Sequence, residues 1–516
     1  MKNSAKSKPS AKLLESYVKK ILSSRVYDVA SRTPLDEAPL LSKRLNNEIW
    51  IKREDLQPVF SFKLRGAYNK MSGLSEAQLN AGIIAASAGN HAQGVALAAQ
   101  TLKVSATIVM PKTTPDIKVA AVQRLGANTH LHGDSYDNAY ERAIQLAEER
   151  QLTFIHPYSD PEVIAGQGTV AMEILQQHPG SLDAIFVPVG GGGLIAGVTA
   201  YVKYLHPEIK IIGVEPDDAA CLKAALDAGR RVSLKHIGIF ADGVAVRQVG
   251  KEPFAVLKHY VDEVITVSAD EICAAIKDIF DETRSIAEPA GALSLAGLKR
   301  YVETNQISDQ RLVVIDSGAN MNFDRLRHIS ETAELGEHRE FFFAVTIPER
   351  PGSFKEFCKT VGNKPVTEFN YRYAHDADAH VFVGVKLVEG AAEKTELLNR
   401  LTQMDYAVTD LSDNEMAKLH VSHMVGGRAP SLTNEVLYRF EFPERPGALL
   451  NFLNKISRRW NISLFHYRNH GAAFGRVLVG IQVPHAERSQ FRHSLDDVGY
   501  PYWEETDNPA YQLFLK

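Results

Sequence analysis

Between about residue 50 and residue 320, short runs of apolar, often β-branched residues alternate with longer amphipathic stretches. The apolar runs lie at 83–85, 106–110, 184–187, 211–214 and 312–315, and the clearest amphipathic stretches lie at 139–150 and 164–177. Continuous apolar runs separated by helices are typical of a parallel sheet that is covered on both faces. The alternation therefore predicts an α/β fold with doubly wound, mostly parallel sheets, which bind ligands beyond the carboxyl ends of their strands.

Length, charge and cysteine content narrow the class of protein. A chain of 516 residues is too long for one hydrophobic core. Its net charge of −4 argues against a nucleic-acid partner, which usually requires a basic surplus. Cys221, Cys273 and Cys358 are too widely spaced for a zinc site or a disulfide framework, so they indicate a reducing, cytoplasmic environment. The sequence has no apolar run of about 18 residues and no signal-peptide core, so we expect no membrane span.

Composition also predicts the domain boundaries. We interpret the basic, polar start, residues 1–20, as a flexible tail, and residues 21–325 as the α/β domain. A polar stretch rich in Arg, His and Glu follows, and residues 326–340 of it read as a neck between domains.

Beyond the neck the chain repeats itself. The segment Pro348–Gly352 (PERPG) recurs at 443–447, an offset of 443 − 348 = 95. Val381–Val385 recurs at 477–481 and Tyr371-Arg372 at 467–468, both at an offset of 96. Matched landmarks in one order indicate an internal repeat. We predict two α+β units of the type βαββα at 341–415 and 436–508, joined by a linker over 421–434 that contains Gly426-Gly427 and Pro430.

The first segment with chemical potential is Ser61–Ala67 (SFKLRGA). A lysine is usually solvated on the surface, and that reading is the simpler one for Lys63. However, Phe62 precedes it, and Gly66-Ala67 permits tight packing at a helix start. A lysine that loses its hydration becomes less basic and can act as a Schiff-base nucleophile.

The second segment is Ala86–Gly94 (ASAGNHAQG), which directly follows the apolar run at 83–85 and opens a helix. Small residues at such a turn expose backbone N–H groups, which bind anions. Asn90 adds an amide that can hydrogen-bond a ring hydroxyl. The alternative is a simple N-cap cluster without a ligand.

The third segment is Val187–Leu194 (VPVGGGGL). Four glycines between a strand and a helix allow backbone N–H groups to surround a phosphate. The segment lacks both the GK[ST] ending of a nucleotide loop and the GxGxxG spacing of a dinucleotide site, which argues against a dinucleotide oxidoreductase. A flexible linker is the alternative.

The fourth segment is Asp316–Asn320 (DSGAN), at the end of the apolar run 312–315. The hydroxyl of Ser317 would lie at a strand's carboxyl end, where it could meet a ring nitrogen. A plain turn is equally consistent with these residues.

In this order, the four segments resemble the tryptophan-synthase-β-like class of pyridoxal-phosphate enzymes, and within it the serine/threonine dehydratases. With the repeated C-terminal part, nearly the whole chain is similar to the biosynthetic threonine dehydratases (threonine ammonia-lyases). The resemblance implies a two-lobed catalytic domain that binds pyridoxal 5′-phosphate and deaminates L-threonine to 2-oxobutanoate.

The resemblance also implies residue roles. Lys63 would bond covalently to the cofactor and then shuttle the Cα proton of the substrate. Asn90 would contact the cofactor's phenolic oxygen, and Ser317 its pyridine nitrogen. The phosphate would lie on Gly190, Gly191, Gly192, Gly193 and the Leu194 backbone. The substrate carboxylate would lie on Ser87, Ala88, Gly89, Asn90 and His91, and Glu288 belongs to a segment that closes the pocket.

Two positions depart from related serine racemases. Those enzymes resemble this chain but carry a serine, which acts as a second base, at the position of Ala88. Alanine has no proton to give, so we expect little racemisation. They also bind a divalent cation in the segment that matches Glu215–Cys221. Here Cys221 replaces the aspartate, and a thiol is a poor ligand for Mg²⁺ or Ca²⁺, so we expect no metal.

The repeats resemble the paired ACT-like modules of biosynthetic threonine dehydratases, which implies inhibition by isoleucine, activation by valine and a homotetramer. A tail that only builds the oligomer is the alternative. For the whole chain, two other functions stay open at this point: a non-catalytic amino-acid sensor, and a serine dehydratase or cysteine-synthase-like transferase.

Overall fold

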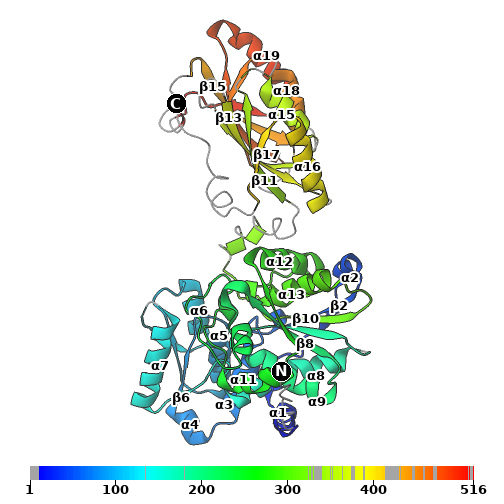
Figure 1. Cartoon of the computed structure of the whole chain (residues 1–516). Coiled ribbons are helices and arrows are strands. Elements are labelled where there is room, and N and C mark those ends of the chain that lie inside the picture. Colours follow the sequence, from blue (N-terminus) through cyan, green and yellow to red (C-terminus); the bar gives the residue numbers. More distant parts are fainter. Residues whose placement is uncertain are drawn as a thin grey trace. The chain divides into compact units, whose positions relative to one another are not determined.

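The computed structural model describes residues 11–516, except 134, 179, 323–324, 327–328, 331–339, 349, 351, 363, 373–377, 388–389, 413–428, 430–431, 444–447, 457–458, 469–473, 509–510, 512–514 and 516. The chain divides into two compact units, with the boundary between residues 336 and 337. Figure 1 shows helices on both sides of the sheets in the first unit, and one large sheet with helices along it in the second.

The first unit contains two sheets. The larger has the strand order β1 (Leu35–Glu37), β2 (Glu48–Arg53), β10 (Arg311–Asp316), β7 (Ala184–Pro188), β8 (Lys210–Pro216), β9 (Glu263–Val267), and all its pairs are parallel except β1–β2. The smaller is wholly parallel, in the order β5 (Asn128–Leu131), β4 (Ala106–Met110), β3 (Ile83–Ala86), β6 (Thr153–Phe154). Two parallel sheets make the two lobes, so the predicted fold class is confirmed.

The helices of this unit are α1 (Lys12–Leu22), α2 (Pro39–Leu45), α3 (Lys63–Ser72), α4 (Glu76–Ala81), α5 (Asn90–Leu102), α6 (Asp116–Arg124), α7 (Tyr136–Arg150), α8 (Pro161–Gln177), α9 (Gly193–Leu205), α10 (Cys221–Asp227), α11 (Lys251–Tyr260), α12 (Ala269–Thr283) and α13 (Pro289–Asn305). The short 3₁₀ turns are η1 (Val26–Asp28), η2 (Glu54–Leu56), η3 (Asp217–Ala219) and η4 (Asp242–Val244).

Alternate residues of the central strands enter two different cores. In β7, Ile185 and Val187 pack in one hydrophobic cluster, whereas Ala184 and Phe186 pack in the cluster on the opposite face. The side chains of β10 alternate in the same way, and Val313 and Ile315 pack in the same cluster as Ile185 and Val187. Side chains of a strand alternate between faces, so a run that is apolar throughout requires cover on both faces.

The predicted flexible tail, residues 1–20, is wrong from residue 12 onward. α1 begins at Lys12, and Leu14, Tyr17, Val18 and Ile21 form one buried face that joins the core around α8 and α9. Their spacing of three and four residues is that of a helix face. The basic and polar residues between them concealed this pattern in the sequence.

The second unit is one antiparallel sheet with the order β14 (Ala407–Asp410), β11 (Glu340–Pro348), β13 (Asp378–Lys386), β12 (Val366–Arg372), β16 (Asn461–Arg468), β17 (Phe474–Gln482), β15 (Glu435–Pro443), β18 (Tyr502–Glu504). Its helices are α15 (Ser353–Val361), α16 (Ala391–Gln403), α18 (Ala448–Ile456) and α19 (Arg488–Val498), with η6 at His485–Glu487. One hydrophobic cluster joins the sheet to these helices, for example through Phe357, Phe452 and Phe465.

The two repeats meet through β12 and β16, which pair antiparallel. Asn370 lies opposite His466, and 466 − 370 = 96, which is the repeat offset. Equivalent positions of the two copies therefore face each other, as a local two-fold axis requires. Each copy also has one strand more than predicted, β14 and β18, which makes the order βαββαβ. The predicted linker, 421–434, lies mostly outside the described residues.

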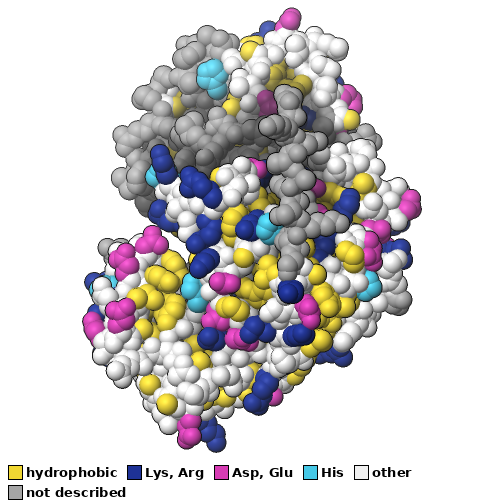
Figure 2. Space-filling model, turned by 60° about the horizontal axis from the view of Figure 1, so that its bottom comes forward, with side chains coloured by type: hydrophobic (Ala, Val, Ile, Leu, Met, Phe, Trp, Pro, Cys, Tyr) yellow, Lys and Arg dark blue, Asp and Glu magenta, His cyan; other side chains and the backbone are white. Residues whose placement is uncertain are grey.

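Among the described helices, none is long and apolar enough to cross a membrane. The surface view shows apolar patches among charged side chains of both signs (Figure 2). Large exposed apolar residues of the first unit include Phe60 and Ile117, each 55% exposed, which line one shallow hollow together with Leu125.

Candidate active site

All of the predicted site residues line one cavity of about 950 Å³ in the first unit. They come from the start of α3 and from the segments that follow β3, β7 and β10. In both parallel sheets the cavity therefore lies beyond the carboxyl ends of the strands, where this class of fold binds ligands.

Lys63 is the first residue of α3. The described residues offer its amine no hydrogen bond or ion pair, and the ring of Phe62 lies with its centre 5.1 Å from Nζ. Loss of hydration lowers the pKa of Lys63 to about 8, against a smaller opposing effect of the Glu288 carboxyl. An amine with this pKa is partly neutral near neutral pH, so it can act as a nucleophile and as a base.

The segment after β3 lies between that strand and α5, which begins at Asn90. The first backbone N–H groups of a helix have no partner inside the helix, and they attract anions. The amide of Asn90 is fixed at both ends: Nδ2 donates to Glu288 Oε1 at 2.6 Å, and Oδ1 accepts from Asn320 Nδ2 at 2.8 Å. Burial lowers the pKa of His91 to about 3, so the ring is neutral.

The glycine segment between β7 and α9 has no space for side chains. A β-carbon on Gly191 would overlap the ring of Tyr158, and one on Gly190 would lie 2.8 Å from Val244 Cα. Gly192 has φ +90°, a conformation that disfavours other residues. The bare backbone and the start of α9 at Gly193 and Leu194 therefore line the cavity.

Ser317 follows β10 and is 3% exposed. Its hydroxyl donates to Ala290 O at 3.2 Å. Two backbone contacts join this segment to the one before α3: Phe62 N donates to Ser317 O, and Ser61 forms an isolated bridge with Gly318. Lys63 and Ser317 thus enter the cavity from two adjoining segments.

These residues fit pyridoxal phosphate. The aldehyde needs a free amine, which Lys63 offers, and the phosphate needs clustered N–H donors without side chains, which the glycine segment and the start of α9 offer. The ring nitrogen needs a polar partner, and Ser317 supplies a neutral hydroxyl.

Sequence reasoning missed part of the cavity wall. Asp242, in η4, receives Lys118 Nζ of α6 at 2.5 Å, and Tyr140, His156 and Tyr158 contribute aromatic rings. Burial lowers the pKa of His156 to about 4. These residues carry no motif of their own, so only their proximity in the folded chain identifies them.

Glu288 predicts a pH dependence of stability. Burial raises the pKa of Glu288 from 4.5 to about 7. Between these values the folded chain holds a proton that the unfolded chain releases, so the free energy of unfolding should fall as pH rises, by about 3 kcal/mol in total. Glu288→Gln should remove this contribution. The melting temperatures of both proteins between about pH 5 and pH 8 would test it, and parallel curves would contradict it.

In the segment Glu215–Cys221, which matches the cation-binding segment of serine racemases, the side chains of Glu215 and Cys221 make hydrogen bonds within the protein. The Glu215 carboxylate accepts the backbone N–H groups of Leu222 at 2.8 Å and Lys223 at 2.9 Å, so it caps the start of α10. Cys221 donates to Gly190 O at 3.4 Å, and burial raises the pKa of its thiol. Among the described residues no cluster of three or more His, Cys, Asp or Glu side chains could hold a metal ion. That this segment binds no metal stays a prediction.

Family models match both units. Residues 26–318 match the family described as pyridoxal-phosphate dependent enzyme. Residues 331–421 and again 426–515 match the C-terminal regulatory domain of threonine dehydratase, so the two matches coincide with the two repeats.

Relatives and solved structures agree with these matches. The chain is 55% identical over 502 residues to the L-threonine dehydratase biosynthetic IlvA of Burkholderia multivorans, covering 97% of this chain and 99% of that protein. It is 54% identical to the protein of that name from Escherichia coli, with 97% of each covered. The processed form of threonine deaminase isoform 2 from Solanum lycopersicum aligns with a TM-score of 0.62 and 50% identity, over 63% of this chain and 94% of that chain.

Proposed function

The chain belongs to the pyridoxal-phosphate-dependent enzymes and, within them, to the biosynthetic threonine dehydratases, and on this premise we propose that it deaminates L-threonine to 2-oxobutanoate and ammonia. The observation that supports this reaction most directly is the amine of Lys63, which has no hydrogen bond or ion pair within the described part of the chain and shares one cavity with the glycine segment and Ser317.

The geometry supports a position for three groups of the cofactor: the phosphate, the phenolic oxygen and the ring nitrogen. The phosphate of the cofactor would lie on Gly190–Gly193 and the Leu194 N–H, at the positive end of α9. Asn90 would direct its amide at the phenolic oxygen, since Glu288 and Asn320 hold that amide in place. Ser317 would turn its hydroxyl from Ala290 O to the ring nitrogen.

The substrate would lie at the start of α5. Its carboxylate would accept N–H groups from Ser87 to His91, which leaves Cα near Lys63. The bound cofactor supplies an electron sink for negative charge at Cα. Lys63 would take the Cα proton, and hydroxide would leave from Cβ. The released enamine gains a proton at Cβ and loses one from nitrogen to become an imine, and water then adds to the imine and displaces ammonia, which leaves the ketone.

The two repeats support a regulatory role. The resemblance to biosynthetic threonine dehydratases implies isoleucine as inhibitor and valine as activator, and the two matches to the regulatory domain of threonine dehydratase support a place for these effectors in the repeats. A homotetramer is what the resemblance implies, and a location in the cytoplasm fits the three free, buried cysteines.

One titration tests the reaction. Addition of L-threonine to the purified protein should change the visible spectrum of the bound cofactor and release 2-oxobutanoate, with a higher kcat/KM than L-serine gives. A preference for serine would favour a serine dehydratase. A protein without visible absorbance and without turnover would be an amino-acid sensor.

The proposed position of Ser317 leads to a prediction about the ratio of two outcomes, return of a proton to Cα and loss of hydroxide from Cβ. In Ser317→Asp, a carboxylate would keep the ring nitrogen protonated and strengthen the electron sink, so charge at Cα would last longer. Return of a proton to Cα should then increase relative to loss of hydroxide. Deuterium incorporation into recovered threonine, relative to 2-oxobutanoate formed in D₂O, measures this ratio. Ser317→Asn is the neutral control of equal size, and equal ratios in the two variants would mean that Ser317 does not face the ring.

A further inference from the structure

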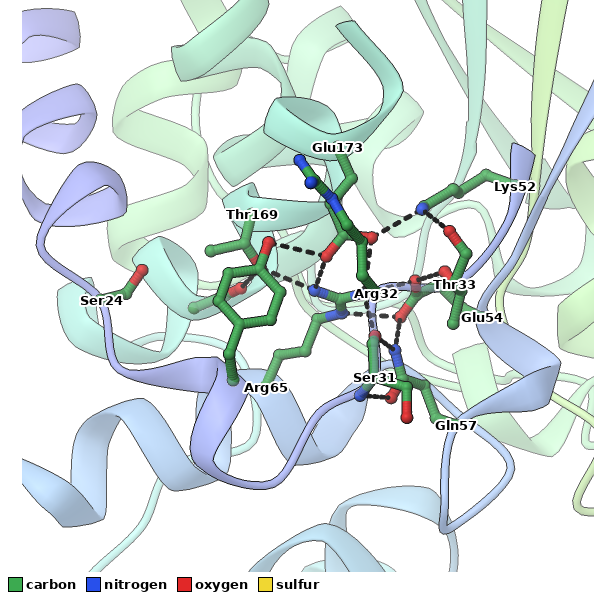
Figure 3. Close-up of polar contacts among 12 residues, drawn as sticks. Ser24, Ser31, Arg32, Thr33, Lys52, Glu54, Gln57, Arg65, Thr169 and Glu173 are labelled. Carbon is green, nitrogen blue, oxygen red and sulfur yellow. Dashed lines mark hydrogen bonds and ion pairs between the residues drawn. The ribbon is translucent and has the colours of Figure 1, made fainter. Parts of the chain in front are cut away.

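A buried cluster of charges surrounds Arg65, which follows Lys63 by two residues on α3. It contains Arg65, Glu54, Glu173 and Lys52, and all four side chains are 0% exposed. We call these four residues the Arg65 network. Its two positive and two negative charges balance. Figure 3 shows the Arg65 guanidinium between the carboxylates of Glu54 and Glu173.

Every N–H group of Arg65 has an acceptor. Nε and Nη2 donate to the two oxygens of Glu54, both at 2.8 Å. Nη1 donates to Glu173 Oε1 at 2.6 Å and to Thr169 Oγ1 at 3.1 Å, and Nη2 also reaches Glu173 Oε2 at 3.1 Å. A planar guanidinium with two forked partners permits only one orientation.

The partners of Arg65 stand on the elements that must be aligned with Lys63. Arg65 is in the first turn of α3, two residues after Lys63. Glu54 begins η2 directly after β2, and β2 pairs with β10, which leads to Ser317. Glu173 and Thr169 belong to α8. The network therefore connects the helix of Lys63 to the sheet edge of Ser317.

Close backbone packing holds α3 against α8 and α5. A β-carbon on Gly66 would lie 2.6 Å from Val163 O of α8, and one on Gly94 of α5 would lie 3.0 Å from the Lys63 carbonyl carbon. Directional contacts add to this packing: Asn69 Nδ2 donates to Glu162 O at 2.8 Å, and Lys70 pairs with Asp160 at 2.8 Å. These contacts join α3 to α8, whereas the Arg65–Glu54 fork joins α3 to η2, next to the strand that pairs with β10.

The stability of the fold alone does not explain the Arg65 network. Burial of ion pairs costs hydration, and apolar residues of similar volume often stabilise a fold equally well or better. Paired hydrogen bonds between a guanidinium and a carboxylate fix the geometry of both groups, which apolar packing does not do. We propose that Arg65 is a positioning residue, whose forked contact with Glu54 aims the Lys63 amine at the cofactor. This proposal rests on the proposed role of Lys63.

Two double variants of the full chain test the proposal. Arg65→Met/Glu54→Gln and Lys52→Met/Glu173→Gln each remove one positive and one negative charge from the network. Only the first separates α3 from η2, because the second leaves the Arg65–Glu54 fork intact. Lys52 stands on β2, where it donates to Glu173 Oε2 and Thr33 O, both at 2.6 Å. The second variant is therefore the matched control.

The main readout is formation of the bond between cofactor and Lys63. Each protein is stripped of cofactor and mixed with pyridoxal phosphate, the visible absorbance is followed in time, and the bond is then reduced with borohydride and located by mass spectrometry. At similar melting temperatures, Arg65→Met/Glu54→Gln should form the bond with Lys63 more slowly than the control. Its kcat should fall by about 10²-fold, as displacement of a reacting group by about 1 Å does, with a smaller change in KM.

Equal rates of bond formation in the two double variants would overturn the proposal and leave Arg65 a structural residue. If the first variant does not fold, Arg65→Lys replaces it, because lysine keeps the charge but loses the fork. Normal bond formation in Arg65→Lys would overturn the proposal as well. The proposed function fails separately, if the unaltered protein itself forms no bond with Lys63.

Discussion

Replacement of Lys63 by alanine should abolish the visible absorbance of the lysine-bound cofactor and lower threonine deamination by at least about 10²–10⁴-fold, the range that one positioned acid–base group supplies. The loss should appear in kcat, because the missing amine acts on the Cα proton rather than in carboxylate binding. The melting temperature of the cofactor-free protein should change little, since the Lys63 amine has no hydrogen bond or ion pair to lose among the described residues.

Lys70→Ala provides the matched control for this variant. Lys70 lies on the same helix and pairs with Asp160 at 2.8 Å, and its side chain is 25% exposed. This partly buried pair does not line the active-site cavity, so absorbance and turnover should stay close to those of the unaltered protein. If Lys63→Ala retained normal deamination, another group would be the base and the assignment of Lys63 would be wrong.

Removal of the second unit should abolish the response to isoleucine while threonine deamination continues. The polar stretch of the sequence begins near residue 323, so the sequence alone would place the cut there, but the structure argues for residue 336. Ile329 packs in the core of the first unit, and Arg325 donates to Phe240 O at 3.1 Å and pairs with Asp242 at 3.5 Å. A cut at 323 would remove these contacts from a segment that lines the active-site cavity.

The expected size of the effect follows from allosteric coupling. Coupling between sites is typically about 1–3 kcal/mol, which corresponds to a shift of roughly 5–150-fold in apparent threonine affinity. The complete chain should therefore show sigmoidal kinetics that isoleucine deepens and valine relieves. Isoleucine titration of a soluble, active truncated chain is the measurement. Inhibition at the same isoleucine concentration would place the sensor in the first unit and leave the repeats with an oligomer-building role.

Local sequence signals predicted much of this protein. The apolar runs at 106–110 and 184–187 became β4 and β7, because a strand buried on both faces must be apolar throughout. The small and glycine residues that follow such strands gave the positions of Ser87–His91 and Gly190–Gly193, since a turn from strand to helix has its own composition. The repeat offset likewise predicted two similar units, because two copies of one fold need the same landmarks in the same order.

Only the tertiary structure decided how distant residues meet. Glu288 reaches Asn90 across 198 positions of the sequence, and Glu173 reaches Arg65 across 108. Periodicity and composition describe a segment by itself, so they carry no information on which segment lies opposite, or on which buried charges balance. For the same reason the sequence could not show that α1 packs against the core, or that Asn370 pairs with His466. These pairings depend on the path of the whole chain, and the same path brings Lys63, the glycine segment and Ser317 to one cavity.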